Sequence, residues 1–241
     1  MIVRAIKTNI FRESEKLAPF ILKHIPKIKE GSVLAVTSKI VALSEGRTAT
    51  PRNKNEKEKI IRAESEWAVE SYPNWWLTIK DGTFVINAGV DDSNANGKLV
   101  LLPKNCFLSA EKIREVLRKH YRIKKLGILI TDSRVSPLRK GVFGMALGYA
   151  GFRGLRDYRG DPDIFGRTLK VTQVGVADSL AAAAALVMGE GREQQPLAII
   201  EDAPVEFCNK INKHELRIKP EEDIFRPLFA KFNLIRGRKK D

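Results

Sequence analysis

The sequence predicts an α+β protein of mixed sheets with packed helices, and three observations support this prediction. Short apolar runs typical of strands alternate with helical patterns, but not regularly enough for a doubly wound parallel sheet. Apolar residues make up 43% and charged residues 30% of the chain, which is the balance of a globular protein with a full core. The two cysteines, Cys106 and Cys208, are too few and too distant in sequence to predict a disulfide framework or a zinc site.

In the first half of the chain, a helical rhythm of apolar residues appears twice, and shorter continuous apolar runs indicate strands. Pro73 is expected to end the second helix, because proline cannot continue one. In chain order the expected elements are a strand at 2–6, a helix at 13–27, a strand at 33–37, a helix at 55–72, and strands at 84–90 and 99–102.

In the second half, Ser109 is expected to cap a helix that runs to about residue 120. Residues 139–167 contain seven glycines that interrupt any periodicity, so we expect a long functional loop there. The other expected elements are strands at 126–131, 168–173 and 197–200 and an alanine-rich helix at 176–188.

Two aspartates follow predicted strands. Residues 127–131 lead into Asp132 and Ser133, where we expect the strand to stop, and residues 84–90 run into Asp91 and then Asn94. Each aspartate taken singly is better explained by a turn or a helix cap. Together, oxygen ligands at two strand ends are what a hard divalent cation needs, and such a cation usually arrives with a phosphorylated substrate. The pair therefore indicates a metal site.

Two further segments could bind phosphate, each with an ordinary structural alternative. Ser38 and Lys39 follow a strand and offer a hydroxyl and a cation, although such a pair is also common in turns. Residues 189–191 (Gly-Glu-Gly) could cradle phosphate with backbone N–H groups, but glycine is also expected where a helix ends. No Walker pattern occurs, so the residues alone predict a metal- and phosphate-binding enzyme without naming its reaction.

The chain carries a net charge of +14, and part of the excess lies in a basic tail at residues 231–241. Tails of this kind are commonly solvated, although an anionic partner is the alternative. We therefore expect any nucleic-acid binding to be weak and confined to the tail. No run of eighteen apolar residues and no signal-peptide pattern occurs, so a cytoplasmic protein without a membrane span is expected.

Five motifs between Gly31 and Ile200 are together similar to one known family. They are Val36-Thr-Ser-Lys-Ile-Val41 with Glu45-Gly-Arg47, Ile86-Asn-Ala-Gly-Val-Asp91-Asp-Ser-Asn94, Ile130-Thr-Asp132-Ser133 with Arg139 and Gly141, Gly148-Tyr-Ala-Gly151 through Gly166-Arg167, and Ala177-Asp178 through Met188-Gly189-Glu190. In this order they resemble the coenzyme F420-0:γ-glutamyl ligase family. Such agreement is specific for the fold and less specific for the substrate.

The resemblance implies a function and a site. The family joins L-glutamate to an acidic, phosphodiester-containing cofactor, using GTP and a divalent cation, Mg²⁺ or Mn²⁺, and forms a homodimer of two-lobed protomers. By this resemblance Asp91 and Asp132 are the catalytic acids. The expected ligands are, for metal, Asp91, Asp132, Ser133 and Glu190, and, for nucleotide, Ser38, Lys39, Asn94, Met188, Gly189, Gly191 and Arg192.

The chain also departs from the family pattern. Leu43 stands where the family has a lysine, Ser179 where it has a glutamate, and residues 8–11 where it has a Gly-Leu-Pro loop. Arg134-Val135-Ser136-Pro137-Leu138 replaces a Trp-Gly-Arg-Pro-Trp segment. Since a lost cation leaves an anionic group without its charge-assisted bond, we expect a changed acceptor, with coenzyme F420-0 a poor substrate or none.

We expect one catalytic domain at residues 1–200 and a C-terminal extension with a basic tail at 201–241. Two other functions stay open beside the γ-glutamyl ligase. One is a non-catalytic module that binds nucleotide or RNA on the same fold, and the other is a different ligase that forms an acyl phosphate. The acceptor and the choice of GTP over ATP cannot be read from the sequence.

Overall fold

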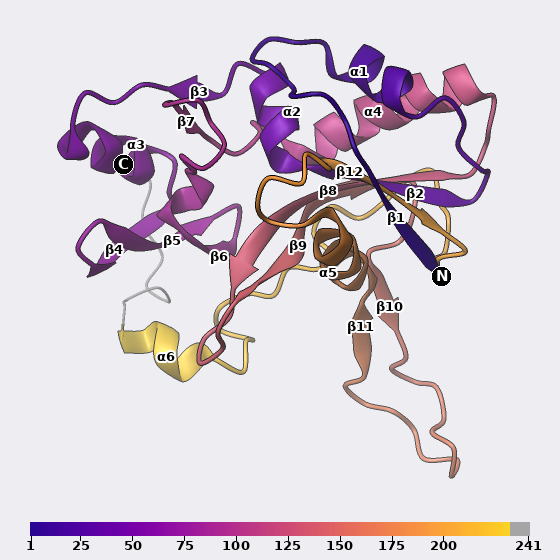
Figure 1. The fold of residues 1–241 in the computed structure, drawn as a ribbon. Helices are drawn as coiled ribbons and strands as arrows, with labels where there is room; N and C mark the ends of the chain where they lie inside the picture. The colour runs from indigo at the N-terminus through magenta and orange to yellow at the C-terminus, as the bar shows by residue number, and fades with distance from the viewer. Residues whose placement is uncertain (232–241) are drawn as a thin grey trace.

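A computed structural model describes residues 1–231 and shows a five-stranded mixed sheet at the centre of the molecule (Figure 1). Its strands, in spatial order, are β1 (Ile2–Ile6), β12 (Leu197–Glu201), β2 (Ser32–Thr37), β8 (Leu126–Val135) and β9 (Val142–Ala150). Only β2 and β8 pair in parallel, and the other three pairs are antiparallel. The predicted α+β class is therefore confirmed.

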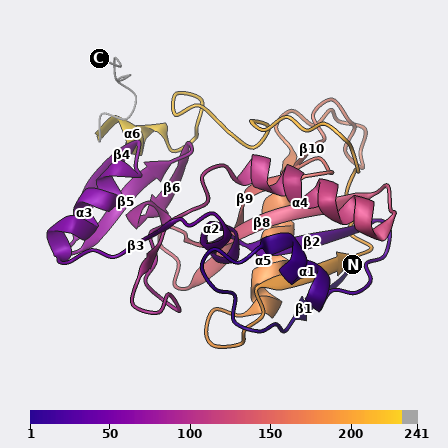
Figure 2. The same cartoon turned by 90° about the horizontal axis from the view of Figure 1, so that it is seen from above.

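Helices cover both faces of this sheet (Figure 2). One face packs against α1 (Leu17–His24), α2 (Ser38–Ser44) and α4 (Cys106–Tyr121), and the other packs against α5 (Val176–Met188). Strand β2 shows why this works: Leu34 and Val36 enter the first core, whereas Val33 and Ala35 enter the second. Because side chains alternate along a strand, a run of apolar residues without polar interruption is the pattern of a strand buried on both faces.

A smaller part of the chain forms beside the central sheet (Figures 1 and 2). It consists of β3 (Thr48–Ala49), α3 (Lys54–Ala63), β4 (Trp67–Tyr72), β5 (Trp75–Lys80), β6 (Thr83–Ile86), the 3₁₀ turn Asn87–Gly89 and β7 (Leu99–Val100). It has its own hydrophobic cluster around Ile61 and Trp76. This division is consistent with the two-lobed protomer that the sequence predicted.

Two segments extend from these layers. An arm begins and ends with the short ribbon of β10 (Leu155–Asp157) and β11 (Gln173–Gly175) and projects from the molecule (Figure 1). The C-terminal extension runs back over the protein and ends in α6 (Arg226–Lys231), where Phe229 stacks on Phe84 of β6. The rest of the basic tail, residues 232–241, lies outside the described residues.

The helix predicted at residues 55–72 is wrong beyond Ala63. Residues 67–72 form β4 instead, and they pair with β5, which the sequence did not predict, across a turn at Pro73 and Asn74. Asn74 has a φ of 68°, a conformation that asparagine adopts more readily than most residues. Aromatic and branched residues on both sides of such a turn favour a hairpin, and this pairing outweighs the local helical spacing.

The irregular loop predicted at residues 139–167 is also wrong in part, since β9 and β10 lie inside it. The glycines of β9 serve close packing. A Cβ atom at Gly144 would lie 2.2 Å from the carbonyl oxygen of Ala181 in α5, and one at Gly148 would lie 2.5 Å from the carbonyl carbon of Cys106 in α4. Glycine composition alone could not distinguish a loop from a strand packed tightly between helices.

Smaller differences concern element boundaries. Asn105, rather than Ser109, caps α4, and the hydroxyl of Ser109 donates to Glu45. The helix predicted at 13–27 is confined to α1, the strand at 84–90 ends with β6, and the strand at 168–173 is replaced by β11, which begins at Gln173. The strands at 2–6, 33–37, 126–131 and 197–200 and the helix at 176–188 are confirmed.

Candidate active site

A cleft of about 1950 Å³ lies between the central sheet and the smaller part of the chain. Its walls come from α2, the ends of β6 and β8, the turn between α5 and β12, and α6. All the predicted site residues except Ser38 line this cleft directly: Lys39, Asp91, Asn94, Asp132, Ser133, Met188, Gly189, Glu190, Gly191 and Arg192. Ser38 is buried behind them and contacts Asp132.

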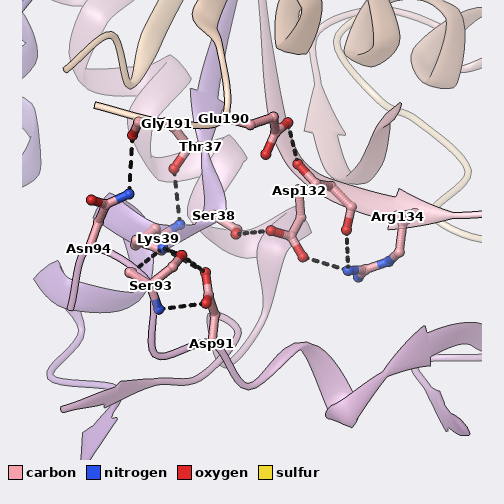
Figure 3. Close-up of polar contacts among 11 residues, drawn as sticks. Thr37, Ser38, Lys39, Asp91, Ser93, Asn94, Asp132, Arg134, Glu190 and Gly191 are labelled. Atoms are coloured by element: carbon pink, nitrogen blue, oxygen red, sulfur yellow. Dashed lines mark hydrogen bonds and ion pairs between the residues drawn. The ribbon is translucent and has the colours of Figure 1, made fainter. Parts of the chain in front are cut away.

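Lys39 and Asp91 form the first polar contact of the cleft (Figure 3). Lys39 lies in the first turn of α2, whose N-terminus is capped by the side chain of Thr37. Its ammonium group donates to Asp91 Oδ2 at 2.6 Å, to the Ser93 carbonyl oxygen at 2.7 Å and to Ser93 Oγ at 3.1 Å. Burial raises the pKa of Asp91, but the bonds from Lys39 and Ser93 outweigh it, so the pKa lies below its ordinary value.

Asp132 forms the second contact, and its strand does not stop where the sequence predicted. Strand β8 continues through Asp132 and Ser133 to Val135, paired with β9. Ser38 Oγ donates to Asp132 Oδ1 at 3.1 Å, and Arg134 Nη1 donates to Oδ2 (Figure 3). Because alternate residues of a strand share one face, the continuing strand places Arg134 on the same side as Asp132.

The glycine-rich turn after α5 closes the third side of the cleft. Gly189 is the C-cap of α5, so the helix end that was the structural alternative for this segment is present, and its φ of 79° suits glycine. Ser133 Oγ donates to Glu190 Oε1 at 2.6 Å, and Asn94 Nδ2 donates to the Gly191 carbonyl oxygen at 3.2 Å (Figure 3). The turn therefore touches both β8 and the loop that follows Asp91.

Two of the predicted nucleotide contacts, Met188 and Gly191, are already engaged within the protein. Met188 is buried in the α5 core, so its side chain serves packing. The backbone N–H of Gly191 already donates to the carboxylate of Glu193, at 2.8 Å. Arg192 is exposed at the cleft. An anion bound by this turn would therefore have to displace Glu193, which sequence reasoning did not identify.

The predicted metal ligands fit a divalent cation in their chemistry, because all four offer carboxylate or hydroxyl oxygens to one cleft. Each aspartate already holds a cation of the protein, Lys39 for Asp91 and Arg134 for Asp132. Within residues 1–231, no three His, Cys, Asp or Glu side chains are gathered closely enough to form a metal site. A bound divalent ion would therefore compete with Lys39 and Arg134 for these carboxylates.

Sequence reasoning missed two contributions to the site. Arg134 appeared in the sequence only as a departure from a motif, and its role depends on the continuation of β8. The C-terminal extension lines the cleft with Asp223, Phe225, Leu228 and Phe229, although no motif marks it. Residues 130–135, Ile-Thr-Asp-Ser-Arg-Val, show no alternating pattern that marks Arg134, so the fold alone brings both this residue and the extension to the cleft.

The departures from the family pattern fall largely on the cleft. Leu43, Val135, Ser136 and Leu138 all line it. Ser179, by contrast, donates its hydroxyl to the Gly175 carbonyl oxygen within α5, and it is not part of the cleft wall. The substitutions at the cleft wall are therefore placed where they could affect ligand binding.

A mixed sheet with a large cleft between two parts of one chain, lined by apolar side chains together with charged and hydroxyl groups, is typical of a substrate-binding enzyme. Sequence comparison identifies its family: the model described as F420-0:Gamma-glutamyl ligase matches residues 5–202. The chain thus belongs to the F420-0:γ-glutamyl ligase family. The match begins before Gly31, so it includes α1 and the end of β1, which the sequence motifs did not cover.

Curated relatives support this assignment. The coenzyme F420:L-glutamate ligase of Methanococcus maripaludis strain S2 is 47% identical over 169 residues, which cover 70% of this chain and 67% of that protein. Its counterpart in strain C6 is 38% identical over 231 residues, 89% of this chain and 92% of that protein. The Methanopyrus kandleri enzyme of the same name is 34% identical, covering 89% and 93%. The chain is therefore an enzyme of a ligase family.

Among the described residues, no helix is both long and apolar enough to cross a membrane.

Proposed function

We propose that this enzyme joins L-glutamate through an amide bond to an acidic acceptor of the coenzyme F420-0 type, with GTP as co-substrate and Mg²⁺ or Mn²⁺ as cofactor. Its relatives are named for ligation of L-glutamate to coenzyme F420. The observation that carries the proposal is the convergence of Ser38, Lys39, Asp91 and Asp132 on one cleft from both parts of the chain.

This set of groups suits the activation of a carboxylate by phosphate. An oxygen of the acceptor carboxylate attacks the γ-phosphorus of GTP, the bond to the bridging oxygen breaks, and GDP leaves. The amino group of glutamate then attacks the acyl carbon, loses a proton, and expels inorganic phosphate. Lys39 would neutralise phosphate charge once it leaves Asp91, and Ser38 would orient Asp132.

A divalent cation would be held by Asp91 and Asp132, with Ser133 and Glu190 beside it. When bound, it would supply positive charge to the phosphate oxygens during transfer. The contact between Ser133 and Glu190 supports this assignment, because it already joins two of the proposed ligands from separate elements.

A changed acceptor is the second candidate, and the positions of Leu43, Val135, Ser136 and Leu138 favour it. The expectation that coenzyme F420-0 is a poor substrate stays a prediction. Losing a cation from an anion-binding site costs about 1.5–3 kcal/mol, or one to two decades of affinity. A panel of acidic acceptors, with coenzyme F420-0 among them, would measure this difference directly as kcat/KM.

The decisive experiment follows nucleotide cleavage with Mn²⁺, L-glutamate and the panel of acidic acceptors present. We expect wild-type protein to release phosphate from GTP, and we expect Asp132→Asn to lose at least about tenfold of that rate. Asp81→Asn is the matched control, because Asp81 lies outside the cleft wall and its φ of 51° also suits asparagine. If wild-type protein binds nucleotide, as detected by thermal shift, but never cleaves it, the non-catalytic module is favoured.

A further inference from the structure

Arg134 is a buried guanidinium on the wall of the cleft. Its side chain is only 5% exposed, although the residue lines the cleft. Nη1 donates to Asp132 Oδ2 and, at 3.2 Å, to the Ser133 carbonyl oxygen (Figure 3). Nε is also buried, and it has no hydrogen-bond partner among the described residues.

An unpaired buried donor on a charged group is unusual in a folded protein and calls for an explanation. A guanidinium presents five N–H donors in a planar fork, and this fork matches two oxygens of a carboxylate or a phosphate. The contacts with Asp132 and Ser133 both use Nη1. The edge that carries Nε thus retains a donor for an oxyanion.

The charge partner of Arg134 is itself shared. Asp132 is 27% exposed, accepts a hydrogen bond from Ser38, and belongs to the residues proposed to hold a divalent cation. If Asp132 turns to another cation, Arg134 keeps only the Ser133 carbonyl oxygen as a partner among its present contacts. A buried positive charge left in that state strongly favours an incoming anion.

We propose that Arg134 is the anion-binding residue of this cleft and receives a carboxylate or phosphate group of a substrate in exchange for Asp132. The inference rests on the proposed function and deepens it, since it names the residue that fixes an anionic group beside the reacting centre.

The exchange predicts opposite effects for two neighbouring substitutions. Asp132→Asn removes the internal competitor and should tighten anion binding by about tenfold, whereas Arg134→Met should weaken it by at least about tenfold. Arg134→Lys should restore part of the loss, because lysine keeps the charge but not the planar fork. Lys140→Met is the control, because Lys140 is exposed in the β8–β9 turn and lies outside the cleft wall.

The test uses inorganic phosphate and glutarate as separate probes, without metal, nucleotide or acceptor. Binding is measured by titration calorimetry, and the Nε–H signal of Arg134 is followed by NMR in protein labelled with ¹⁵N-arginine. The signal is assigned by its absence from Arg134→Met. A saturable shift of this signal with either probe supports the proposal, and the probe that binds more tightly identifies phosphate or carboxylate as the recognised group.

The proposal is overturned if neither probe shifts the Arg134 signal, or if both probes bind wild-type, Asp132→Asn and Arg134→Met protein equally. Should Arg134→Met fail to fold, Arg134→Lys, which also lacks the Nε–H group, assigns the signal, and the wild-type NMR titration and Asp132→Asn then decide the question. None of these measurements requires ligase activity. Failure of the proposed function would appear as absent GTP cleavage in protein that still binds the anions through Arg134.

Discussion

Lys39 and Arg134 determine the state of the two aspartates in the cleft. Each holds one carboxylate, so Asp91 and Asp132 take part in internal ion pairs rather than standing as free acids. Such pairs contribute little stability where they are exposed. Their larger consequence is that substrates and metal compete with groups of the protein itself.

The lowered pKa of Asp91 predicts how one of these pairs responds to acid. A carboxyl whose pKa is lower in the folded than in the unfolded protein stabilises the fold above its unfolded pKa, which is about 3.9 for aspartate. This stability is lost as the pH falls through the lowered pKa. Because Asp91 is 44% exposed, we expect Asp91→Asn to cost only about 0.5 kcal/mol at pH 7.

Urea unfolding of wild-type and Asp91→Asn protein between pH 7 and pH 2.5 would measure this effect. The difference in unfolding free energy should shrink towards zero at the acid end. Asp81→Asn, for which the same ion pair remains intact, serves as the control. A difference that grows as the pH falls would contradict the assignment of the pair.

Strand β9 is the element that brings helices from both faces close to the central sheet. Gly144 meets the backbone of α5, and Gly148 meets the backbone of α4. Of these two helices, α5 reaches the cleft, since it ends at the glycine-rich turn. The packing of this strand therefore helps to fix the position of Glu190 and the residues around it.

We predict that Gly144→Ala destabilises the protein by about 1–3 kcal/mol, because its Cβ would meet backbone atoms that cannot move independently. Gly175→Ala is the matched control. A Cβ at Gly175 would lie 3.6 Å from Asp178, which is an ordinary contact, and should change stability by less than about 0.5 kcal/mol. Denaturant unfolding would compare them, and equal stability of the two variants would show that α5 shifts to accommodate the methyl group.

The projecting arm is the clearest reason to expect association of the whole molecule. Ile164, Phe165 and Val171 are exposed by 92%, 83% and 84%. Large apolar side chains gathered on one projecting segment favour an interface there. Phe152, which precedes the arm, does not contribute, because it is fully buried in the α5 core.

We therefore predict a homodimer in which the arm contacts the partner. Light scattering at micromolar concentration should give about twice the chain mass of 27.1 kDa. Phe165→Arg should shift the protein towards monomer, whereas Lys140→Arg, outside the arm, should not. A stable wild-type monomer at these concentrations would contradict the prediction.

The net charge of +14 also belongs to the molecule as a whole. We predict that RNA or DNA binding, if it occurs, is weak, steeply dependent on salt, and lost on deletion of residues 236–241. Filter binding at two salt concentrations and GTP cleavage by the same deletion variant would check this. Tight binding that survives both the deletion and added salt would instead favour the non-catalytic binding module.

The class of fold, the buried strands and the family could all be predicted from the sequence alone. A continuous apolar run such as Val33–Val36 indicates a strand buried on both faces, whichever strands lie beside it. The acidic motifs around Asp91 and Asp132 are likewise short stretches of sequence that can be recognised without the fold. These features depend on residues close together in the chain, so a linear reading identifies them.

The pairing of the cleft residues, by contrast, depends on the tertiary structure. Pairing with β9 extends β8 beyond Asp132 and places Arg134 beside it. Pairing with β5 makes residues 67–72 a strand instead of a helix. The extension reached the cleft through Phe229, far from any motif. Each of these outcomes depends on partners distant in sequence, and the free energy of such long-range contacts outweighs local propensity.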